Sequence, residues 1–273
     1  MNNLFNKTCF YSSKKTTQLY STSFSSGILF FHRSIRQDIY NIYGFVRFAD
    51  EIVDTYMGVD SAEILNEFKQ ETFKAIERGV SFNPIIHSFQ LTVTKHEIDL
   101  ELIHSFLKSM EMDLSKKEFN KEQFDQYVYG SAEVIGLMCL SVFTKDKSEY
   151  LNLKNCAVAL GSAFQKINFI RDMGSDFYDR GRIYFPKVEF SNFSNREKKE
   201  IEHQISQELE LARQGILKLP RNSRKGVFLA FSYYMSLFSK IISTESSELQ
   251  SKRIRISNWQ KFLIMIRVTL QTA

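Results

Sequence analysis

The chain has 273 residues, of which 43% are hydrophobic, and its 36 Lys or Arg against 31 Asp or Glu give a formal charge of +5. This length allows one large domain or two smaller ones, and only 11 Gly and 3 Pro interrupt the apolar pattern, which favours one domain. Charges of one sign form no long run, so nothing supports nucleic-acid binding.

The N-terminal stretch is polar and lacks the apolar core of a signal peptide, and we expect residues 1–18 to be poorly ordered. Cys9, Cys139 and Cys156 are odd in number and far apart, so the pattern predicts neither a disulfide framework nor a zinc site. Together these features predict a cytoplasmic protein.

Apolar residues recur mostly at helical spacing, and no alternating strand pattern competes with them. We therefore expect an all-α bundle with helices at about 33–57, 61–78, 84–91, 96–110, 120–143, 148–179, 195–217, 223–244 and 257–271. The breaks between them contain no long Pro, Gly or Ser linker, which again favours a single domain over residues 1–273.

The first expected helix carries two carboxylates four residues apart, Asp50 and Asp54, on the same face as Tyr43 and Arg47. The opposite face is apolar, with Phe45, Phe48 and Ile52. A helix apolar almost all round is expected to be buried, and carboxylates facing an interior need a cation or an ionic ligand. The alternative is an ordinary carboxylate pair on a solvated face.

A second pair, Asp172 and Asp176, repeats this spacing in the helix expected at 148–179 and shares its stripe with Gln165 and Asn168. Amide and carboxylate oxygens are ligands that suit Mg²⁺, which commonly takes one or two carboxylates and completes its shell with water and phosphate oxygens. Two opposed pairs would thus hold several ions and a diphosphate. The alternative is the polar face of an amphipathic helix.

Arg47 and Arg171 lie within a few residues of the acidic pairs and could clamp a departing diphosphate, or form internal salt bridges instead. The 25 Phe and 12 Tyr could line an apolar tunnel that stabilises a carbocation. Tyr43 and Tyr129 are the candidates for such a role, with ordinary core tyrosines as the alternative.

The C-terminal stretch from Trp259 to Leu270 is apolar but carries Lys261 and Arg267. Such a helix can lie on a membrane surface, or it can pack on its own domain. Both interpretations stay open at this point.

Three segments resemble the squalene and phytoene synthase family of head-to-head prenyl transferases. They are Tyr20-Ser21-Thr22-Ser23-Phe24, the helix from Tyr40 to Asp54, and the stretch from Leu160 to Asp176 followed by Arg180 to Pro186. The likeness runs in order from about residue 20 to 270. The chain departs from the family pattern at Tyr20, Glu51 and Ser175, where members often have His, Asp and an acidic residue, and in a longer link between Asp176 and Arg182.

The resemblance implies a single-domain, isoprenoid-synthase-type helical bundle around a central cavity. It implies that Mg²⁺, with Mn²⁺ as an alternative, is held by Asp50, Asp54, Asn168, Asp172 and Asp176. It implies substrate contacts, mainly with diphosphate, from Tyr20, Ser21, Ser23, Tyr43, Arg47, Gln165 and Arg171. The expected catalytic residues are Asp50, Asp54, Asp172, Asp176 and Tyr129.

The implied reaction joins two geranylgeranyl diphosphates through a cyclopropylcarbinyl diphosphate into phytoene, for carotenoid formation and without NADPH. Coupling of two farnesyl diphosphates to squalene or dehydrosqualene is the alternative, and NADPH would be the reductant for squalene. A catalytically silent scaffold for membrane-associated isoprenoid enzymes is a third hypothesis. The expected partners are prenyl diphosphates and downstream carotenoid enzymes, with peripheral contact at the inner face of the membrane.

Overall fold

The computed structural model describes residues 3–55, 60–115, 118–186 and 188–271. These residues form an all-α fold, as predicted, and the β pairing among them is a single isolated bridge between Glu118 and Ile183. The helices are α1 (Asn3–Tyr20), α2 (Thr22–Ile28), α3 (Arg33–Thr55), α4 (Ser61–Arg78), α5 (Pro84–His96), α6 (Leu100–Ser115), α7 (Lys121–Val128), η1 (π-helix, Tyr129–Glu133), α8 (Val134–Phe143), α9 (Lys147–Arg180), η2 (3₁₀, Phe190–Asn192), α10 (Asn195–Lys218), α11 (Arg221–Ile242), α12 (Ser246–Ser251) and α13 (Asn258–Gln271).

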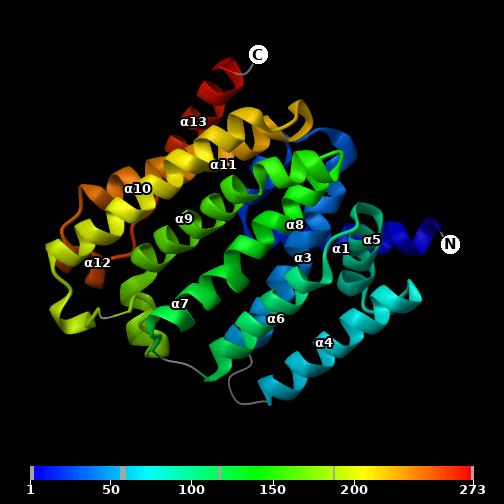
Figure 1. The fold of residues 1–273 in the computed structure, drawn as a ribbon, viewed down its shortest axis with the longest axis horizontal. Coiled ribbons are helices and arrows are strands. Elements are labelled where there is room, and N and C mark those ends of the chain that lie inside the picture. Colours follow the sequence, from blue (N-terminus) through cyan, green and yellow to red (C-terminus); the bar gives the residue numbers. More distant parts are fainter. Residues whose placement is uncertain (1–2, 56–59, 116–117, 187, 272–273) are drawn as a thin grey trace.

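The long helix α9 organises the bundle (Figure 1). It packs against α8 and η1 on one side and against α10 and α11 on the other, while α3 packs on α8 and α6. One continuous hydrophobic cluster extends from Ile28 to Ile254. The described chain is therefore a single domain whose two acid-bearing helices, α3 and α9, belong to the same core.

Local signals fix the ends of the key helices. Helix α9 begins after Asp146, whose carboxylate accepts a hydrogen bond from the backbone N–H of Glu149 at 2.9 Å. It ends at Arg180, and the next residue, Gly181, caps it with a left-handed φ of 63°. Helix α5 runs to His96, further than expected, because Glu97 adopts the left-handed conformation only there. The expected end of α3 at residues 56–57 lies outside the described residues.

The helix expected at 120–143 contains a π-helical turn between α7 and α8. Gly130 in this turn lies so close to α6 that a Cβ would be 2.5 Å from the carbonyl oxygen of Ser105. Gly161 of α9 packs equally closely on the turn, since a Cβ there would lie 2.7 Å from the carbonyl oxygen of Ala132. The glycines thus let α6, η1 and α9 meet backbone to backbone.

Within the N-terminal stretch 1–18, which was expected to be poorly ordered, residues 3–18 belong to helix α1, and residues 1–2 lie outside the described residues. Helix α1 packs on α3 and α5. Its buried face consists of small and polar side chains, with Cys9, Ser13 and Thr17 fully buried. The Ser13 hydroxyl lies 2.6 Å from that of Ser88, and Gly44 of α3 lets Ser13 approach closely. This face lacks the apolar periodicity that reveals a helix in sequence. Helices α2 and α12 are likewise absent from the expected set.

Helix α3 is buried along most of its length, but it is not apolar all round. Phe45 and Ile52 belong to the core, as expected, whereas Phe48 is 38% exposed. By length and composition, the described stretch Lys121–Phe143 could span a membrane, yet half of its most apolar window is buried inside the bundle. Burial of that kind is typical of core helices.

Candidate active site

The first acidic pair lies on α3, where Asp50 and Asp54 occupy successive turns with side chains 35% and 16% exposed. Arg47, one turn before Asp50, forms ion pairs with both Asp50 and Glu51. Its guanidinium lies over the ring of Tyr20, 4.4 Å from the ring centroid. The end of α1 is thereby attached to the acidic face of α3.

The second acidic pair lies on α9, where Asp172 and Asp176 are 17% and 14% exposed. Asp172 forms an ion pair with the neighbouring Arg171 and another with Arg253, whose Nε lies 2.7 Å from Oδ1. Arg253 comes from the segment after α12, 81 residues along the chain. A distant segment thus supplies a cation to this pair.

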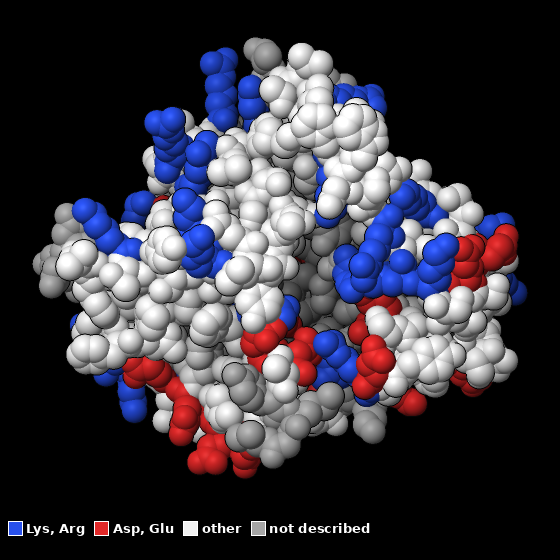
Figure 2. Space-filling model, turned by 180° about the vertical axis from the view of Figure 1, so that it is seen from behind, with Lys and Arg blue, Asp and Glu red and all other residues white. Residues whose placement is uncertain are grey.

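Arg180, the last residue of α9, contacts both pairs, and Arg182 just after the helix contacts the first pair. Arg180 Nη2 donates to Asp54 Oδ2 at 2.9 Å, and its Nη1 lies 3.9 Å from Asp176 Oδ1. Arg182 Nη1 lies 4.0 Å from Asp54 Oδ1. The structure therefore brings the two aspartate pairs together across one site, and Figure 2 shows a hollow in one face with acidic and basic side chains along its lower rim.

Burial and mutual repulsion perturb this site. Burial, together with the charge of Asp54, raises the pKa of Asp50 to about 6. Burial and the charge of Asp172 likewise raise the pKa of Asp176 to about 6. Crowded carboxylates of this kind are stabilised by a cation.

The described residues contain no group of three or more His, Cys, Asp or Glu arranged to hold a metal ion by themselves. The donor set nevertheless fits Mg²⁺, because this ion needs only one or two carboxylates when water and phosphate oxygens complete its octahedron. The two aspartate pairs, with the amide oxygen of Asn168 on the same stripe of α9, are the oxygen donors available for it.

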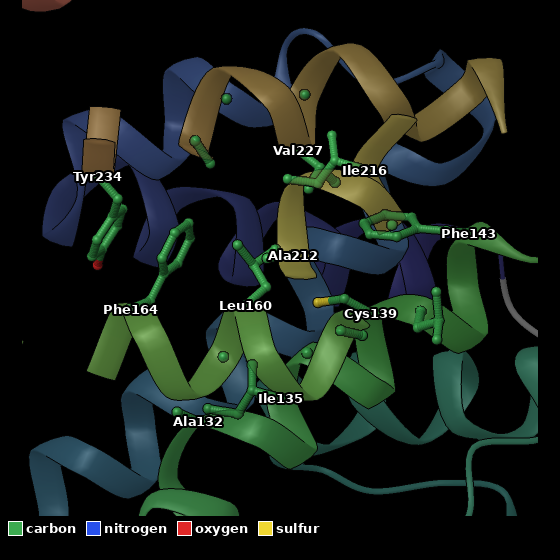
Figure 3. A pocket seen from close by; sticks show the side chains of 18 of the residues that line it. Ala132, Ile135, Cys139, Phe143, Leu160, Phe164, Ala212, Ile216, Val227 and Tyr234 are labelled. Atoms are coloured by element: carbon green, nitrogen blue, oxygen red, sulfur yellow. The ribbon is translucent and has the colours of Figure 1, made fainter. Parts of the chain in front are cut away.

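An apolar cavity of about 280 Å³ begins at Gln165 and Asn168 of α9 and extends into the core (Figure 3). Phe164 and Tyr234 lie at one end and Phe143 at the other, with Leu160 and Ile135 between them. The cavity wall comes from α2, α3, η1, α8, α9, α10 and α11. Apart from a few polar groups, this wall is suited to an extended hydrocarbon.

The polar groups in the cavity include the predicted Gln165 and Asn168. Gln165 Nε2 lies 3.3 Å from Ser131 Oγ, to which it donates, while Asn168 Oδ1 accepts a hydrogen bond of 3.2 Å from the hydroxyl of Tyr234. The ring of Tyr234 stacks on Phe164 at 3.7 Å. Tyr234, which the sequence interpretation missed, therefore links the amide end of the site to the hydrocarbon wall.

A second cavity, of about 420 Å³, adjoins the first, since Phe24, Ala230 and Tyr234 line both. Its wall includes the predicted Ser21 and Ser23 and a set of basic side chains, Arg171, Arg253, Arg255 and Lys261. Of these four, only Arg171 was expected from the sequence. A cationic cavity bordering an apolar one can hold an anion with a long apolar tail.

Tyr43 of α3 contacts the start of α2, which lines both cavities. The side chains of Tyr43 and Ser21 are hydrogen-bonded, and the Tyr43 ring lies 5.5 Å from that of Phe24. Burial raises the pKa of Tyr43 above its ordinary value. Ser21 also caps α2 by accepting a hydrogen bond from the backbone N–H of Phe24, so the start of α2 is held at the site.

The structure does not bring Tyr129 together with the acidic pairs. Tyr129 is 37% exposed on the π-helical turn, and the nearby charges that act on it are those of Glu133, Asp99 and Glu101. Tyr127 is buried instead, and its hydroxyl donates to Asp113 at 2.9 Å. Of the two tyrosines in this segment, Tyr127 borders the arginine-rich end of the site.

Asp113, at the end of α6, is a charged group that the sequence interpretation did not single out. Its side chain is 5% exposed, and Oδ1 lies 3.2 Å from Arg182 Nη1. Arg182 Nη2 also donates to the backbone carbonyl of Asp113 at 2.6 Å, and the ring of Tyr184 stacks on Tyr127. Burial raises the pKa of Asp113 to about 7 despite the charge of Arg182. Asp113 thus anchors the segment after α9 that reaches Asp54.

Comparison with known proteins finds relatives of this chain among the phytoene synthases. A phytoene synthase of Arthrospira platensis is 25% identical over 92% of this chain and 89% of its own length. Phytoene synthase 1 of Zea mays, a chloroplastic protein, is 26% identical over 90% of this chain, which spans only 64% of the maize protein.

Solved structures have the same fold. A dehydrosqualene synthase bound to a ligand superposes with a TM-score of 0.82 at 18% identity, over 97% of each chain. A squalene synthase from Alicyclobacillus acidocaldarius gives a TM-score of 0.76 at 19% identity, over 88% of this chain and 95% of that one. The family model for squalene/phytoene synthases matches residues 17–260. The chain therefore belongs to the squalene/phytoene synthase family.

Proposed function

We propose that this protein is a phytoene synthase that condenses two geranylgeranyl diphosphates head to head in a Mg²⁺-dependent reaction. The observation that carries the proposal is the meeting of two aspartate pairs, on α3 and α9, with an apolar cavity at Asn168 and Gln165. The names of the relatives from Arthrospira platensis and Zea mays favour phytoene as the product.

In the proposed mechanism, the metal would be held by Asp50, Asp54, Asn168, Asp172 and Asp176. Bound Mg²⁺ supplies Lewis-acid stabilisation of the negative charge that develops on a departing diphosphate. Arg171 and Arg253 line the cationic cavity, so they are placed to bind diphosphate oxygens while the prenyl chain extends into the apolar cavity.

The first step breaks the allylic C–O bond of one substrate and releases diphosphate. The double bond of the second substrate attacks the cation, and proton loss gives the cyclopropylcarbinyl diphosphate. A second C–O cleavage releases the other diphosphate, and rearrangement with proton loss yields phytoene. Phe164 and Tyr234 present stacked rings at the junction of the two cavities, where an aromatic wall stabilises positive charge and excludes water.

Coupling of two farnesyl diphosphates is the second candidate, and the fold shared with a dehydrosqualene synthase and a squalene synthase keeps it open. A phytoene product needs no NADPH, whereas squalene does. The silent-scaffold hypothesis is disfavoured, because both acidic pairs and their arginines are present and lie together.

Incubation of the purified protein with Mg²⁺ and either C15 or C20 diphosphate, with and without NADPH, tests the proposal. We expect phytoene from the C20 substrate without NADPH. A C30 hydrocarbon as the dominant product would select the second candidate. Absence of any C30 or C40 hydrocarbon under all four conditions would favour the scaffold.

We also propose a cytoplasmic location and handover of the hydrocarbon to carotenoid-forming enzymes. The free state of Cys9, Cys139 and Cys156 is consistent with a reducing compartment. Mn²⁺ is the alternative metal, because it accepts the same oxygen ligands.

A further inference from the structure

We propose that α13 is a membrane-docking helix that binds the surface of an anionic phospholipid bilayer. Its outward face is apolar, at residues spaced three or four apart along the helix. The exposed fractions are 65% for Trp259, 44% for Phe262, 48% for Leu263, 41% for Ile266 and 75% for Leu270. This spacing places all five side chains on one side of the helix.

The opposite side of α13 holds the helix on the protein. Val268 is 2% exposed and packs with Leu229 and Tyr233 of α11, and Ile264 and Met265 pack on the same small cluster. The helix is therefore fixed on the domain by one apolar face while a second apolar face is presented to the outside. Packing on its own domain accounts for the first face only.

Charge identifies the partner as an anionic surface. Five basic residues and no acidic ones follow Glu248, namely Lys252, Arg253, Arg255, Lys261 and Arg267. Since the chain has 36 basic and 31 acidic residues, the part up to Glu248 has 31 of each and is formally neutral. The whole net charge of +5 is thus carried by the segment that bears the apolar face. Basic residues flanking an exposed Trp, Phe and Leu face are typical of helices that lie in the lipid interface.

The position of α13 in the molecule fits this partner. Lys261 of α13 lines the cationic cavity, which adjoins the apolar cavity at Phe24 and Tyr234. Phe30 packs in the same cluster as Val268, and its neighbour Leu29 is 57% exposed. In Figure 1, α13 lies along the outer edge of the bundle beside α11, and most of the charged side chains on the upper part of the surface in Figure 2 are Lys or Arg. Docking through α13 would place the cavities beside the bilayer.

Trp259 is the only tryptophan in the chain, so its fluorescence reports directly on this face. We expect its emission to shift to shorter wavelength when the full chain is mixed with phosphatidylglycerol vesicles, and the protein to float with them. With phosphatidylcholine vesicles both effects should be much weaker. Changing Phe262, Leu263 and Ile266 together to Gln should lower the affinity for anionic vesicles at least about tenfold.

The charge contribution is tested with Lys252→Gln and Arg267→Gln, which lie outside the cavity wall. Each basic residue near an anionic surface contributes about 1 kcal/mol, so the double variant should bind about thirtyfold more weakly. Phe82→Gln is the matched control, because Phe82 is 92% exposed but lies between α4 and α5. It should bind like the unchanged protein.

Three outcomes would overturn the proposal. One is an unchanged Trp259 emission with no flotation on anionic vesicles. Another is equal binding of the unchanged protein and the triple Gln variant. The third is self-association that is lost in the triple variant without any vesicle binding, since α13 would then be covered by a second copy. None of these measurements uses a prenyl diphosphate, so their failure is distinct from failure of the proposed synthase activity.

Discussion

Gly174, between Asp172 and Asp176, offers a sharp test of how α12 completes the acidic site. A Cβ at this position would lie 2.4 Å from the carbonyl oxygen of Gln250 in α12. To reach an ordinary contact of about 3.5 Å, α12 would have to retreat by about 1 Å. Because Arg253 lies two residues after the end of α12 and its Nε is 2.7 Å from Asp172 Oδ1, the same retreat should weaken that ion pair.

Overpacking of this kind typically costs about 1–3 kcal/mol, and the higher helix propensity of Ala offsets up to about 1 kcal/mol. We therefore expect Gly174→Ala to lower the free energy of unfolding by about 0–3 kcal/mol. Loss of one charge-assisted contact with the diphosphate should raise KM up to about tenfold. Urea unfolding and steady-state release of inorganic diphosphate measure the two effects.

Ser175→Ala is the matched control, because Ser175 is exposed and its hydroxyl bonds only back to the carbonyl of Asp172 within α9. It should leave KM unchanged and stability within about 0.5 kcal/mol. If Gly174→Ala behaved like this control in both assays, the reasoning that α12 positions Arg253 would be refuted.

Three further predictions concern the acidic site. Asp50→Ala and Asp172→Ala should each abolish hydrocarbon formation with the helical circular dichroism unchanged, and full turnover by both would exclude the proposed metal site. Tyr127→Phe should reduce turnover more than Tyr129→Phe, because of the two hydroxyls only that of Tyr127 is hydrogen-bonded to the buried Asp113. Equal effects would contradict the assignment of Tyr127 to the border of the site. Burial raises the pKa of Asp113 to about 7, so the folded state binds the proton of this carboxyl more tightly than the unfolded state does. The free energy of unfolding should therefore fall as pH rises from about 4 to 7. Asp113→Asn should flatten that dependence in urea midpoints measured at pH 5 and 8, and an unaltered slope would show that another group titrates.

The all-α fold and most helix positions could be predicted because their buried faces are apolar at helical spacing. Helix α1 could not, since Cys9, Ser13 and Thr17 form its buried face and only their packing on α3 and α5 reveals it. Helix α12 has six residues, too few for a periodic pattern.

At the site, the two aspartate pairs were evident because their spacing is local to one helix. The partners contributed by distant segments were not. Arg253 and Tyr234 reach the site only through the packing of α12 and α11 on α9. Tyr127 and Tyr129 lie two residues apart and so point in nearly opposite directions on a helix, and sequence alone does not say which one is turned inward.

In the proposed function, the arrangement of charges would link metal binding to diphosphate binding. Six carboxylates meet in the site, from Asp50, Glu51, Asp54, Asp113, Asp172 and Asp176, and five guanidinium groups pair with them, from Arg47, Arg171, Arg180, Arg182 and Arg253. With the carboxylates ionised, the site is thus close to neutral. A divalent cation alone would have to displace an arginine from a carboxylate, and a diphosphate alone would have to draw an arginine away from one. When both bind, the metal takes the aspartates and frees the arginines to bind the diphosphate. The diphosphate likewise takes the arginines and frees the aspartates to bind the metal, so each ligand favours binding of the other. This exchange explains how carboxylates already paired with arginines can still serve as metal ligands.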